Sequence, residues 1–482
     1  MANLIDKSFK GSEAMEEVVN SGRLASIEDA LVMSAVEVEE DYKQYINPYF
    51  VSLLKLLGLN KQFIKASGTK LWDTENVQYI DFLGAYGAIN LGHNHRGVID
   101  KLQGVFHLPN LLQTAVHPLT AALAKNLSII TPGDLQYSFF CNSGAEAVEG
   151  ALKLAKIATG KQRIIYCRGS FHGKSLGALS VTGREKYKKY FGPMVPYAEE
   201  VTFGDIDELK DVLKKYNDIA AFIVEPIQGE GGIIVPPRNY LKEVRAVCTD
   251  HQVLLIVDEV QTGFGRTGYW FCCQEEKITP DIMCLAKSLG GGIMPIGAYI
   301  STEAVWRRGY GSLEKCLLHT STFGGNTFAA AAALATLEVI EEEELPRRAM
   351  EKGEYFLSKL KQLKEKYPLL KDVRGKGLML GLEFAEIKNP LIQKVLTNSN
   401  SETLNEYIGG MIASELANNF QIITAYTLNN PNVIRVEPPL IITYEEIDYF
   451  VESLEKILTK KLSLTSMAMS TTKNILKVLH KN

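Results

Sequence analysis

Apolar residues recur along this chain in two spacings, which predict two kinds of element. Near the amino terminus Leu24, Ile27 and Leu31 follow one another at helix-face intervals, so we expect helices there. The segment from Lys70 to Gly92 instead has short β-like runs around the turn DTEN, which predicts a β-hairpin. The hairpin leads into the main body of the protein.

The middle of the chain alternates short apolar runs with helical stretches. From Leu135 to about Ile300 the runs are rich in β-branched and aromatic residues. Such alternation is typical of a mostly parallel sheet that helices cover on both faces, so the expected fold class is α/β. The predicted strands contain the sequences YSFFC, RIIYC, AAFIVEPI, VLLIVDEV, IMCLA and GAYIS.

A change of composition separates this body from a smaller unit. The alanine-rich stretch from Phe328 to Ile340 predicts a buried helix, and the acidic run from Glu341 to Glu344, followed by Pro346, closes it. Beyond this boundary the pattern predicts a smaller α+β domain. Its parts are an amphipathic helix, a strand pair, a polar insertion, another helix and further strands, with the helix at 349–367, the pair near 377–384, the insertion at 386–406 and the last strands around 433–442.

These patterns divide the chain into four parts. Residues 1–69 form a helical segment that contributes to the small domain, residues 70–345 form the large α/β domain, and residues 346–460 form the small α+β domain. Residues 461–482 form a tail. The tail either docks as a weakly amphipathic helix on the body or on a partner, or it is loosely held.

Composition and charge exclude several classes of protein. The 482 residues are 46% hydrophobic and 22% charged, which gives enough apolar surface for a core and excludes wholesale disorder. The formal net charge is -4 and no long block of Lys or Arg occurs, so nucleic-acid partners are not expected. No signal peptide and no run of about 18 apolar residues is present, so no membrane span is expected. Seven cysteines without a C-x-x-C pair predict reduced thiols in a cytoplasmic protein.

Three local patterns imitate binding motifs without meeting their requirements. The sequence GSFHGKS at 169–175 has one residue too few between its glycines for a P-loop. The glycines of GFGRTG at 263–268 stand too far from the preceding strand, and aromatic residues follow where a dinucleotide-binding helix should begin. His93 and His95 are too few to hold a metal by themselves, so we expect a structural turn and no metal.

The first of three strand ends that can carry chemistry is the sequence CNSGAEAVEG. Asn142, Ser143, Gly144 and Ala145 lie between an apolar run and an amphipathic helix, where backbone N–H groups and the helix dipole suit a phosphate. Ser143 and Glu146 also have the S-x-x-E spacing of a capping box, and on local sequence alone the cap is the preferred interpretation.

The second strand end is VLLIVDEVQTGFG, where Asp258 closes the most apolar run of the chain. Burying a lone carboxylate is costly, so Asp258 needs a cationic partner, and a protonated pyridine nitrogen would serve. Val260, two residues on, points the same way and could press on one face of such a ring. Phe171 could press on the other face, although for Phe171 alone a core aromatic is the simpler explanation.

The third strand end is CLAKSLGGG, where Lys287 follows a buried run and precedes glycines. A lysine there either extends to solvent or lies in an apolar site that lowers its pKa, and the second case makes a Schiff-base nucleophile. Asp258 and Lys287 are 29 residues apart, enough for one strand-helix-strand crossover between neighbouring strands. Open α/β sheets bind ligands at those carboxyl ends.

Taken in order, these segments resemble a known family. The sequences NSGAEAVEGALKLAK, SFHGKSLGALS, VEPIQGEGG, DEVQTGFGRTG, CLAKSLGGG, HTSTFGGN and VIRVEPPL resemble the class III, or ω-, aminotransferases over about residues 45–460. The resemblance implies pyridoxal 5'-phosphate as cofactor and fold type I, with a mostly parallel seven-stranded sheet in the large domain and a smaller α+β domain. It also implies a set of cofactor-binding residues: Ser143, Gly144, Ala145, Phe171, His172, Glu225, Asp258, Val260, Gln261, Lys287 and Thr322.

Position by position, the resemblance assigns roles to several of these residues. Lys287 would bond to the cofactor and move the proton in catalysis, Asp258 would pair with the pyridine nitrogen, and Gln261 would contact the ring 3-hydroxyl. Residues 143–145 would hold the phosphate. Thr322 would reach the phosphate bound to a neighbouring subunit, which implies a homodimer, or a dimer of such dimers, with shared active sites.

A further pair concerns the substrate. Glu230 and Arg435 match the family pair in which the glutamate covers the arginine while an amine binds and swings away for the oxo acid. On sequence alone, a surface charge at a strand edge is the preferred explanation of Arg435. The chain departs from the family at Thr327, where proline is usual, and the 386–406 insertion and the tail have no clear counterpart.

Within the family, the sequence most resembles the putrescine aminotransferases, through INPYF, YSFFCNSG, FHGKSLGALS, CLAKSLGGGIMPIGA and TLNNPNVIRVEPPL. The expected reaction moves the terminal amino group of a small diamine, putrescine or cadaverine, to a 2-oxo acid, with 2-oxoglutarate as expected acceptor, giving an amino-aldehyde and glutamate. Alternatives are acetylornithine, ornithine or 4-aminobutyrate aminotransferase, an enzyme acting on a longer or carrier-bound aldehyde, and an aminomutase. A non-catalytic cofactor-binding protein is disfavoured because Lys287, Asp258 and Gln261 are all present.

Overall fold

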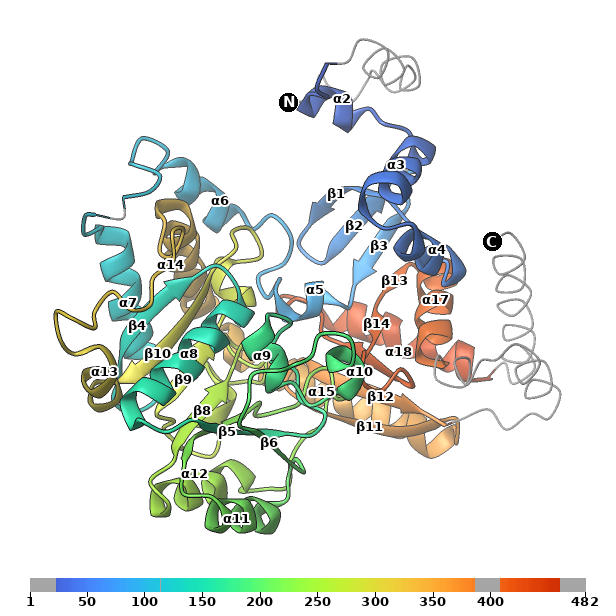
Figure 1. The fold of residues 1–482 in the computed structure, drawn as a ribbon. Coiled ribbons are helices and arrows are strands. Elements are labelled where there is room, and N and C mark those ends of the chain that lie inside the picture. Colours follow the sequence, from blue (N-terminus) through green and yellow to red (C-terminus); the bar gives the residue numbers. More distant parts are fainter. Residues whose placement is uncertain (1–22, 113, 386–407, 460–482) are drawn as a thin grey trace. The chain divides into compact units, whose positions relative to one another are not determined.

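The computed structural model describes residues 23–112, 114–385 and 408–459 (Figure 1), which form two compact units. The first unit holds residues 23–65 and 71–78, and the second holds residues 66–70 and the described residues from 79 to 459. The expected 386–406 insertion and the 461–482 tail lie outside the described residues. The four-part division expected from the sequence therefore stays a prediction.

Helices dominate the first unit, as the amino-terminal spacing predicts. Ser26 and Ser34 each cap a helix with a capping box. In each box the serine hydroxyl accepts a backbone N–H of the first turn, and an acidic side chain three residues on accepts the backbone N–H of the serine. Asn47 caps the helix that begins at Pro48 by accepting two backbone N–H groups. The helices are α2 (Ile27–Leu31), α3 (Ala35–Asp41), the π-helix η2 (Tyr42–Ile46) and α4 (Pro48–Leu56).

The predicted turn DTEN forms between two short strands. The N–H of Asn76 donates to the carbonyl of Asp73 over 3.0 Å, and the N–H of Asp73 donates to the carbonyl of Val77 over 3.2 Å. The strands of this part of the chain are β1 (Phe63–Ser67), β2 (Lys70–Asp73) and β3 (Gln78–Asp81), and the turn labelled α5 (Gly84–Gly87) follows.

A seven-stranded sheet forms the centre of the second unit (Figure 1), in the order β4-β10-β9-β8-β7-β5-β6. Among these strands, β10 pairs antiparallel with both neighbours and the other pairings are parallel. The expected mostly parallel sheet is confirmed. Its strands are β4 (Leu135–Cys141), β5 (Arg163–Cys167), β6 (Ala198–Val201), β7 (Ile219–Val224), β8 (Leu254–Asp258), β9 (Ile282–Leu285) and β10 (Gly297–Thr302).

Helices cover both faces of this sheet because its central strands are apolar on both sides. Along β8, Leu254 and Ile256 join the apolar cluster that includes α8, whereas Leu255 and Val257 join the cluster that includes α7 and α14. The helices of this part are α6 (Arg96–Gln103), α7 (Pro118–Ile130), α8 (Gly144–Thr159), α9 (Leu176–Ser180), α10 (Glu185–Lys188), α11 (Ile206–Lys215), α12 (Tyr240–Asp250), η3 (Cys272–Gln274), η4 (Lys287–Gly290), α13 (Glu303–Tyr310) and α14 (Thr327–Glu342).

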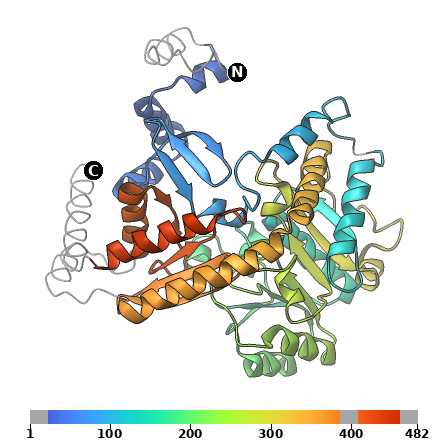
Figure 2. The ribbon, with the colours of Figure 1, turned by 180° about the vertical axis from the view of Figure 1, so that it is seen from behind.

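The carboxyl-terminal part of the second unit is an antiparallel sheet with helices, as expected. Its strand order is β11-β12-β15-β14, and α15 packs against β11 and α18 (Figure 2). Pro346 lies in the first turn of α15, where proline fits a helix start. The elements are α15 (Leu345–Lys366), β11 (Leu370–Lys376), β12 (Met379–Phe384), α17 (Ile408–Phe420), β13 (Ile422–Ile423), β14 (Ala425–Tyr426), β15 (Val433–Val436) and α18 (Tyr444–Thr459).

Two long-range contacts bring the start of this unit beside its end. The strand β13 pairs in parallel with β3, with Ile422 opposite Ile80. The N–H of Glu437, just after β15, donates to the carbonyl of Phe82 over 2.8 Å. The turn that contains Tyr86 is thereby held beside the residues that follow β15.

Candidate active site

Asp258 and Lys287 stand at the same edge of the large sheet. β8 and β9 are parallel neighbours, with Asp258 opposite Cys284, and Lys287 follows the end of β9 by two residues. The predicted adjacency of these strand ends is confirmed, but the expected helix of the crossover is wrong, since the connection contains only the short 3-10 helix η3 (Cys272–Gln274). Both side chains therefore lie at carboxyl strand ends, where open α/β sheets bind their ligands.

Protein groups hold both oxygens of the Asp258 carboxylate. The side chain is 5% exposed, Oδ2 lies 2.7 Å from Nδ1 of His172, and Oδ1 accepts the N–H of Val260 over 3.1 Å. Because a carboxylate is an acceptor, Nδ1 of His172 carries the proton in this contact. Sequence reasoning placed His172 among the cofactor residues without a role. The structure makes His172 a partner that orients Asp258.

Lys287 begins the short 3-10 helix η4 and is half-buried. Burial lowers the pKa of Lys287, and among nearby charges the carboxylate of Glu437 opposes this shift most strongly. Of the two sequence interpretations, the structure therefore favours the apolar site that lowers the pKa. Gly291 and Gly292, with φ of 66° and 71°, adopt the left-handed backbone that the turn after η4 requires.

The start of α8 meets these two strand ends directly. A Cβ at Gly144 would lie 2.9 Å from Cγ1 of Val260 and 3.6 Å from the Cβ of Ala286. Ser143 caps the helix, since its hydroxyl accepts the N–H of Glu146 over 3.2 Å. The cap at Ser143 is confirmed, but the reciprocal bond of a capping box is shifted by one residue, because Glu146 accepts the N–H of Asn142 over 2.6 Å. The phosphate role of this helix start stays a prediction.

Glu225 ties together two loops at the same edge. Its carboxylate accepts the N–H of Phe171 over 2.9 Å and the N–H of Gly229 over 3.1 Å. Burial raises the pKa of Glu225 from an ordinary 4.5 to about 7, with the nearby charge of His172 acting against the shift and that of Asp258 adding to it. Glu225 thus links the loop of Phe171 and His172 to the loop that carries Glu230.

Replacing Glu225 with glutamine should change how stability depends on pH. The raised pKa means that the folded protein binds a proton more tightly than the unfolded chain, so this contribution is complete below about pH 4.5 and is lost as pH rises through about 7. Between about pH 5 and about pH 8 the wild type should lose on the order of 3 kcal/mol that Glu225→Gln does not lose. Denaturant unfolding at both pH values measures this. A stability gap between the two proteins that stays constant would contradict the assignment.

Arg435 is wholly buried, so the surface-charge explanation of this residue is wrong. Its Nη2 lies 2.6 Å from Oε1 of Glu230, and its guanidinium lies 5.0 Å from the ring centre of Tyr86. The expected pairing of Glu230 with Arg435 is therefore present in the fold. The second oxygen of Glu230 accepts the N–H of Leu428 over 3.0 Å, which fixes the carboxylate.

Two further residues of this site escaped the sequence reasoning. Glu437 lies 3.3 Å from Nη1 of Arg435, and its two oxygens accept Nε2 of Gln261 over 3.0 and 3.1 Å. The carbonyl of Tyr86 accepts the same Nε2 over 3.2 Å. Glu437 could have been found, because a spacing of two along a strand places it on the side of Arg435. Tyr86 gives no such signal, since a positive φ of 60° in a loop places it.

Phe171 and Thr322 lie where chain segments converge on the site. The Phe171 ring meets Tyr187 edge-on with centroids 6.4 Å apart. Thr322 is exposed, and the hydroxyl of its neighbour Ser321 accepts Nδ2 of Asn142 over 3.2 Å. The segment of Thr322 therefore lies beside the start of α8, and its contact with a second subunit stays a prediction.

The departure at Thr327 has a local explanation. Thr327 is the first residue of α14, after the helix cap Asn326, and proline fits this position as well. The hydroxyl of Thr327 also donates to the carbonyl of Pro109. The threonine therefore keeps the helix start and ties it to the loop before α7.

Two of the sequence patterns that imitate binding motifs have structural roles in the fold. Nε2 of His93 lies 2.9 Å from Asp81, and Nε2 of His95 lies 3.2 Å from Glu343. Within the parts of the chain that the structure describes, no three His, Cys, Asp or Glu side chains gather as metal ligands would. The glycines of 263–268 form a turn, in which the N–H of Gly265 donates to the carbonyl of Tyr269 over 3.1 Å.

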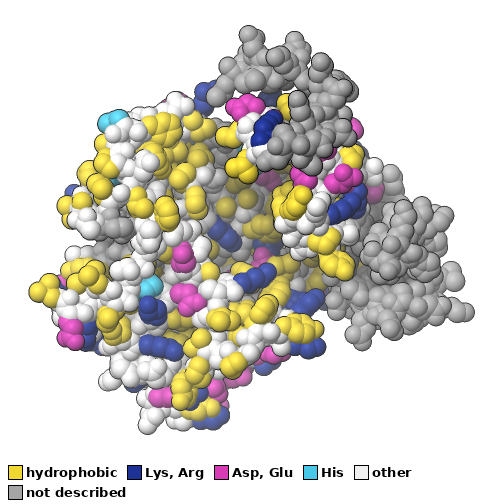
Figure 3. Space-filling model, turned by 45° about the horizontal axis from the view of Figure 1, so that its top comes forward, with side chains coloured by type: hydrophobic (Ala, Val, Ile, Leu, Met, Phe, Trp, Pro, Cys, Tyr) yellow, Lys and Arg dark blue, Asp and Glu magenta, His cyan; other side chains and the backbone are white. Residues whose placement is uncertain are grey.

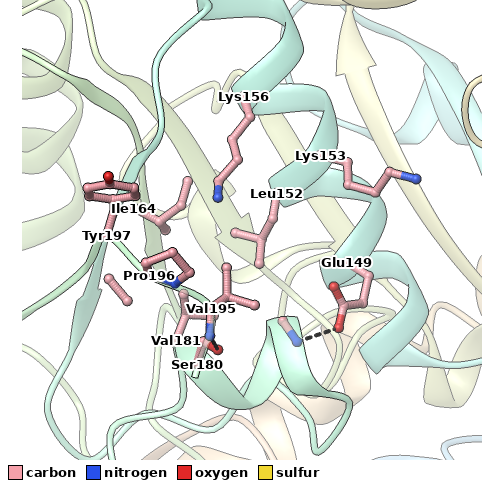
Figure 4. A pocket seen from close by; sticks show the side chains of 12 residues that line it. Glu149, Leu152, Lys153, Lys156, Ile164, Ser180, Val181, Val195, Pro196 and Tyr197 are labelled. Carbon is pink, nitrogen blue, oxygen red and sulfur yellow. Dashed lines mark hydrogen bonds between the residues drawn. The ribbon is translucent and has the colours of Figure 1, made fainter. Parts of the chain in front are cut away.

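A separate pocket lies between α8 and the chain that enters β6 (Figure 4). Lys156 of α8 lines it from one side and residues 195–198 from the other. At its margin, Glu149 accepts the N–H groups of Gly177 and Ala178 at the start of α9, over 2.8 and 3.1 Å. None of the predicted site residues lines this pocket, so the chemistry belongs to the sheet edge.

The residues gathered at the sheet edge fit a phosphorylated pyridine. A buried carboxylate at Asp258 suits a protonated ring nitrogen, and a lysine whose pKa burial lowers suits a covalent bond to an aldehyde. The start of the 16-residue helix α8 suits a phosphate. Because a Cβ at Gly144 would meet Val260 and Ala286, the helix start lies beside both strand ends.

Comparisons with known proteins identify the family. Residues 59–458 match the family described as Aminotransferase class-III. Solved structures with the same fold include ornithine aminotransferase from Toxoplasma gondii, at 29% identity and TM-score 0.79 over 92% of this chain and 100% of that one. An amine transaminase from an uncultivated Pseudomonas species, in a PLP-bound form, has 28% identity and TM-score 0.74 over 83% of this chain and 95% of that one.

Acetylornithine aminotransferase from Elizabethkingia anophelis is similar as well, with 30% identity and TM-score 0.69 over 86% of this chain and 99% of that one. The family match spans most of the chain and agrees with the lysine, the carboxylate and the helix start at the sheet edge. This protein belongs to the class III aminotransferases, pyridoxal 5'-phosphate enzymes of fold type I.

Proposed function

We propose that this enzyme moves the terminal amino group of a small diamine, such as putrescine or cadaverine, to a 2-oxo acid, with 2-oxoglutarate as the expected acceptor. The observation that carries the proposal is the buried ion pair between Arg435 and Glu230, 2.6 Å apart. A glutamate in this position covers the guanidinium, so the site suits an amine chain that has no carboxylate. When Glu230 moves away, the uncovered Arg435 suits the carboxylate of the oxo acid.

The chain's own groups divide the chemistry between them. Bound pyridoxal phosphate supplies an electron sink for the bond that breaks at the amine-bearing carbon. Lys287 would hold the cofactor through its amine, and the freed amine would take the proton from that carbon. Asp258, oriented by His172, would hold a proton at the ring nitrogen, and the start of α8 would hold the phosphate.

A spectroscopic titration tests the proposal. Putrescine, N-acetylornithine, ornithine and 4-aminobutyrate are added separately to the purified protein without any oxo acid. We expect putrescine to shift the long-wavelength absorption band of the cofactor-bound protein to shorter wavelength. If an amino acid alone does so, the diamine assignment is wrong, and the activity of the similar ornithine or acetylornithine aminotransferases becomes the better proposal.

Replacing Arg435 with alanine should separate the two half-reactions. Because only the oxo acid brings a carboxylate that Arg435 would bind, its KM should rise by roughly 10- to 100-fold, as expected for a lost charged hydrogen bond. The KM of the diamine should not rise, because the diamine brings no carboxylate that Arg435 would bind. Steady-state kinetics with each substrate varied measures both values, and Arg435→Lys, which keeps the charge, is the matched control. Equal changes in the two KM values would contradict the switch.

We also propose that the enzyme acts as a homodimer with shared active sites. Large apolar side chains gather around Thr322 along the chain and are exposed: Leu313, Leu317, Leu318 and Phe323. Hydrophobic side chains are also visible on the face shown in Figure 3. Burying this segment against a second copy would stabilise a dimer and bring Thr322 to the partner's phosphate. Light scattering should give about twice the mass of one chain, and a monomer with full activity would contradict the proposal.

We also propose a cytoplasmic location for the enzyme, on the basis of its free cysteines. Cys141, Cys167, Cys248, Cys272, Cys273 and Cys284 are buried and free, and Cys316 is exposed and free. Thiols of this kind are typical of reducing compartments. No described helix is long and apolar enough to cross a membrane.

A further inference from the structure

Arg435 has two carboxylate partners, and a switch of the proposed kind needs only one. Glu230 lies 2.6 Å from Nη2, and Glu437 lies 3.3 Å from Nη1 of the same guanidinium. Glu437 is wholly buried and also accepts Nε2 of Gln261 through both oxygens. Glu437 is therefore fixed from two sides, and the proposed exchange of Glu230 leaves it in place.

The two carboxylates outnumber the guanidinium that they share. Glu230 and Glu437 carry two negative charges against the single positive charge of Arg435. Lys287 is a weak counter-charge to them, because burial lowers the pKa of its amine. An uncompensated charge in a buried site is costly, so this cluster favours a ligand that brings a positive charge.

Arg266 adds a second positive charge near this cluster but does not remove the surplus. Its guanidinium donates to Asn90 and to backbone carbonyls, and Glu437 and, less strongly, Asp81 counteract the lowering of its pKa by burial. Three carboxylates, Glu230, Glu437 and Asp81, thus face the two guanidiniums of Arg435 and Arg266, which leaves one negative charge in surplus.

We propose that Glu437 makes this enzyme selective for amines that carry a second positive charge. Glu437 keeps its hold on Arg435, so Glu230, whose side chain is 12% exposed, retains negative charge for the distal ammonium of a bound diamine. The inference rests on the proposed function and names the positioning residue that sets its substrate class. Glu437 weakens the binding of the oxo acid, because it keeps negative charge beside the arginine that binds the carboxylate of that substrate.

The test compares two amines with the same four-carbon chain on the cofactor-loaded enzyme. Putrescine and n-butylamine differ in the distal ammonium, and the concentration dependence of the absorbance change gives an apparent Kd for each. The amine-loaded form is titrated with 2-oxoglutarate in the same way. Glu437→Gln removes the charge at nearly unchanged shape, and the amide oxygen that it introduces can still accept Nε2 of Gln261.

A matched control removes a carboxylate from the same small-domain sheet. Glu383 on β12 pairs with Arg374 over 2.7 Å, and Arg374 keeps a second partner in Asp372 over 2.9 Å. Glu383→Gln should leave all three Kd values within about twofold. Glu437→Asp keeps the charge but withdraws it by one methylene, so its preference for putrescine should lie between those of the wild type and Glu437→Gln.

The expected result has opposite signs for the two half-reactions. Glu437→Gln should raise the Kd of putrescine about tenfold, as expected for one charge lost across a partly screened distance. The Kd of n-butylamine should stay within about twofold, and the Kd of 2-oxoglutarate should fall. General damage to the site would weaken the binding of all three ligands, so it cannot produce this pattern of Kd values.

Other outcomes separate the two proposals. If the wild type binds putrescine no better than n-butylamine, the diamine function fails and the inference fails with it. If the wild type prefers putrescine and Glu437→Gln keeps that preference, or weakens 2-oxoglutarate as well, the role of Glu437 is wrong and the diamine function stands. If Glu437→Gln does not fold, Glu437→Asp decides, and a preference equal to that of the wild type overturns the role.

Discussion

Lys287→Ala is expected to lower the rate of amino transfer at least about 10³-fold, since a positioned proton-transfer group contributes roughly 10² to 10⁴ and the covalent bond to the cofactor is lost as well. Lys287 is the amine at the end of β9 whose pKa burial lowers, and it stands one strand from Asp258. The lysine side chain makes no contribution to the strand register of β8 and β9. The variant should therefore fold, and single-turnover absorbance measures the loss.

Two control experiments make the prediction for Lys287→Ala specific. A small amine such as methylamine fits the space that the lysine leaves and should restore part of the proton transfer to Lys287→Ala. Lys287→Arg keeps a positive charge but offers no neutral amine at any accessible pH, so it should be as inactive as the alanine variant. A Lys287→Ala enzyme that keeps more than about a hundredth of the wild-type rate would show that another group moves the proton.

The central strands can be predicted from local sequence because their apolar runs are unambiguous. β7, β8 and β9 are buried along their whole lengths, and such continuous runs are typical of central parallel strands. The positions of Asp258 and Lys287 follow from the same pattern, since each stands at the end of one of these runs. Local spacing also predicts the cap at Ser143, because a cap depends on residues three positions apart.

The charges of the site could not be derived in this way. The local sequence does not distinguish Arg435 from a surface arginine on a strand. The residue that pairs with it in the buried site, Glu230, lies more than 200 positions earlier in the chain. His172 meets Asp258 across 86 positions, and nothing in the local sequence SFHG indicates that contact. The family resemblance supplied the pair of Glu230 and Arg435, but it gave no role to Glu437, which only the fold brings to the same guanidinium.

The second large loss of activity is expected when Asp258, the proposed partner of the pyridine nitrogen, is replaced. Asp258→Asn should lower the rate of amino transfer about 10²-fold or more, the scale of losing one preorganised charged contact in a buried site. Asparagine keeps the size of the side chain and can still accept the N–H of Val260. Its amide can also donate to Nδ1 of His172 once the imidazole changes tautomer. The change therefore removes the negative charge that holds a proton at the ring nitrogen, and leaves the packing.

The neighbouring carboxylate provides the control for Asp258. Glu259 is buried on the opposite side of the strand end, where it accepts the N–H groups of Cys272 and Cys273 over 3.1 and 2.8 Å. Glu259→Gln should lower thermal stability, yet leave the rate per cofactor-loaded chain within about threefold. Absorbance per chain and turnover, measured on the same samples, separate loading from chemistry. If Asp258→Asn binds the cofactor and keeps its rate within about tenfold of the wild type, the charge at position 258 is not what sustains the reaction, and the proton at the ring nitrogen must be held by a different group.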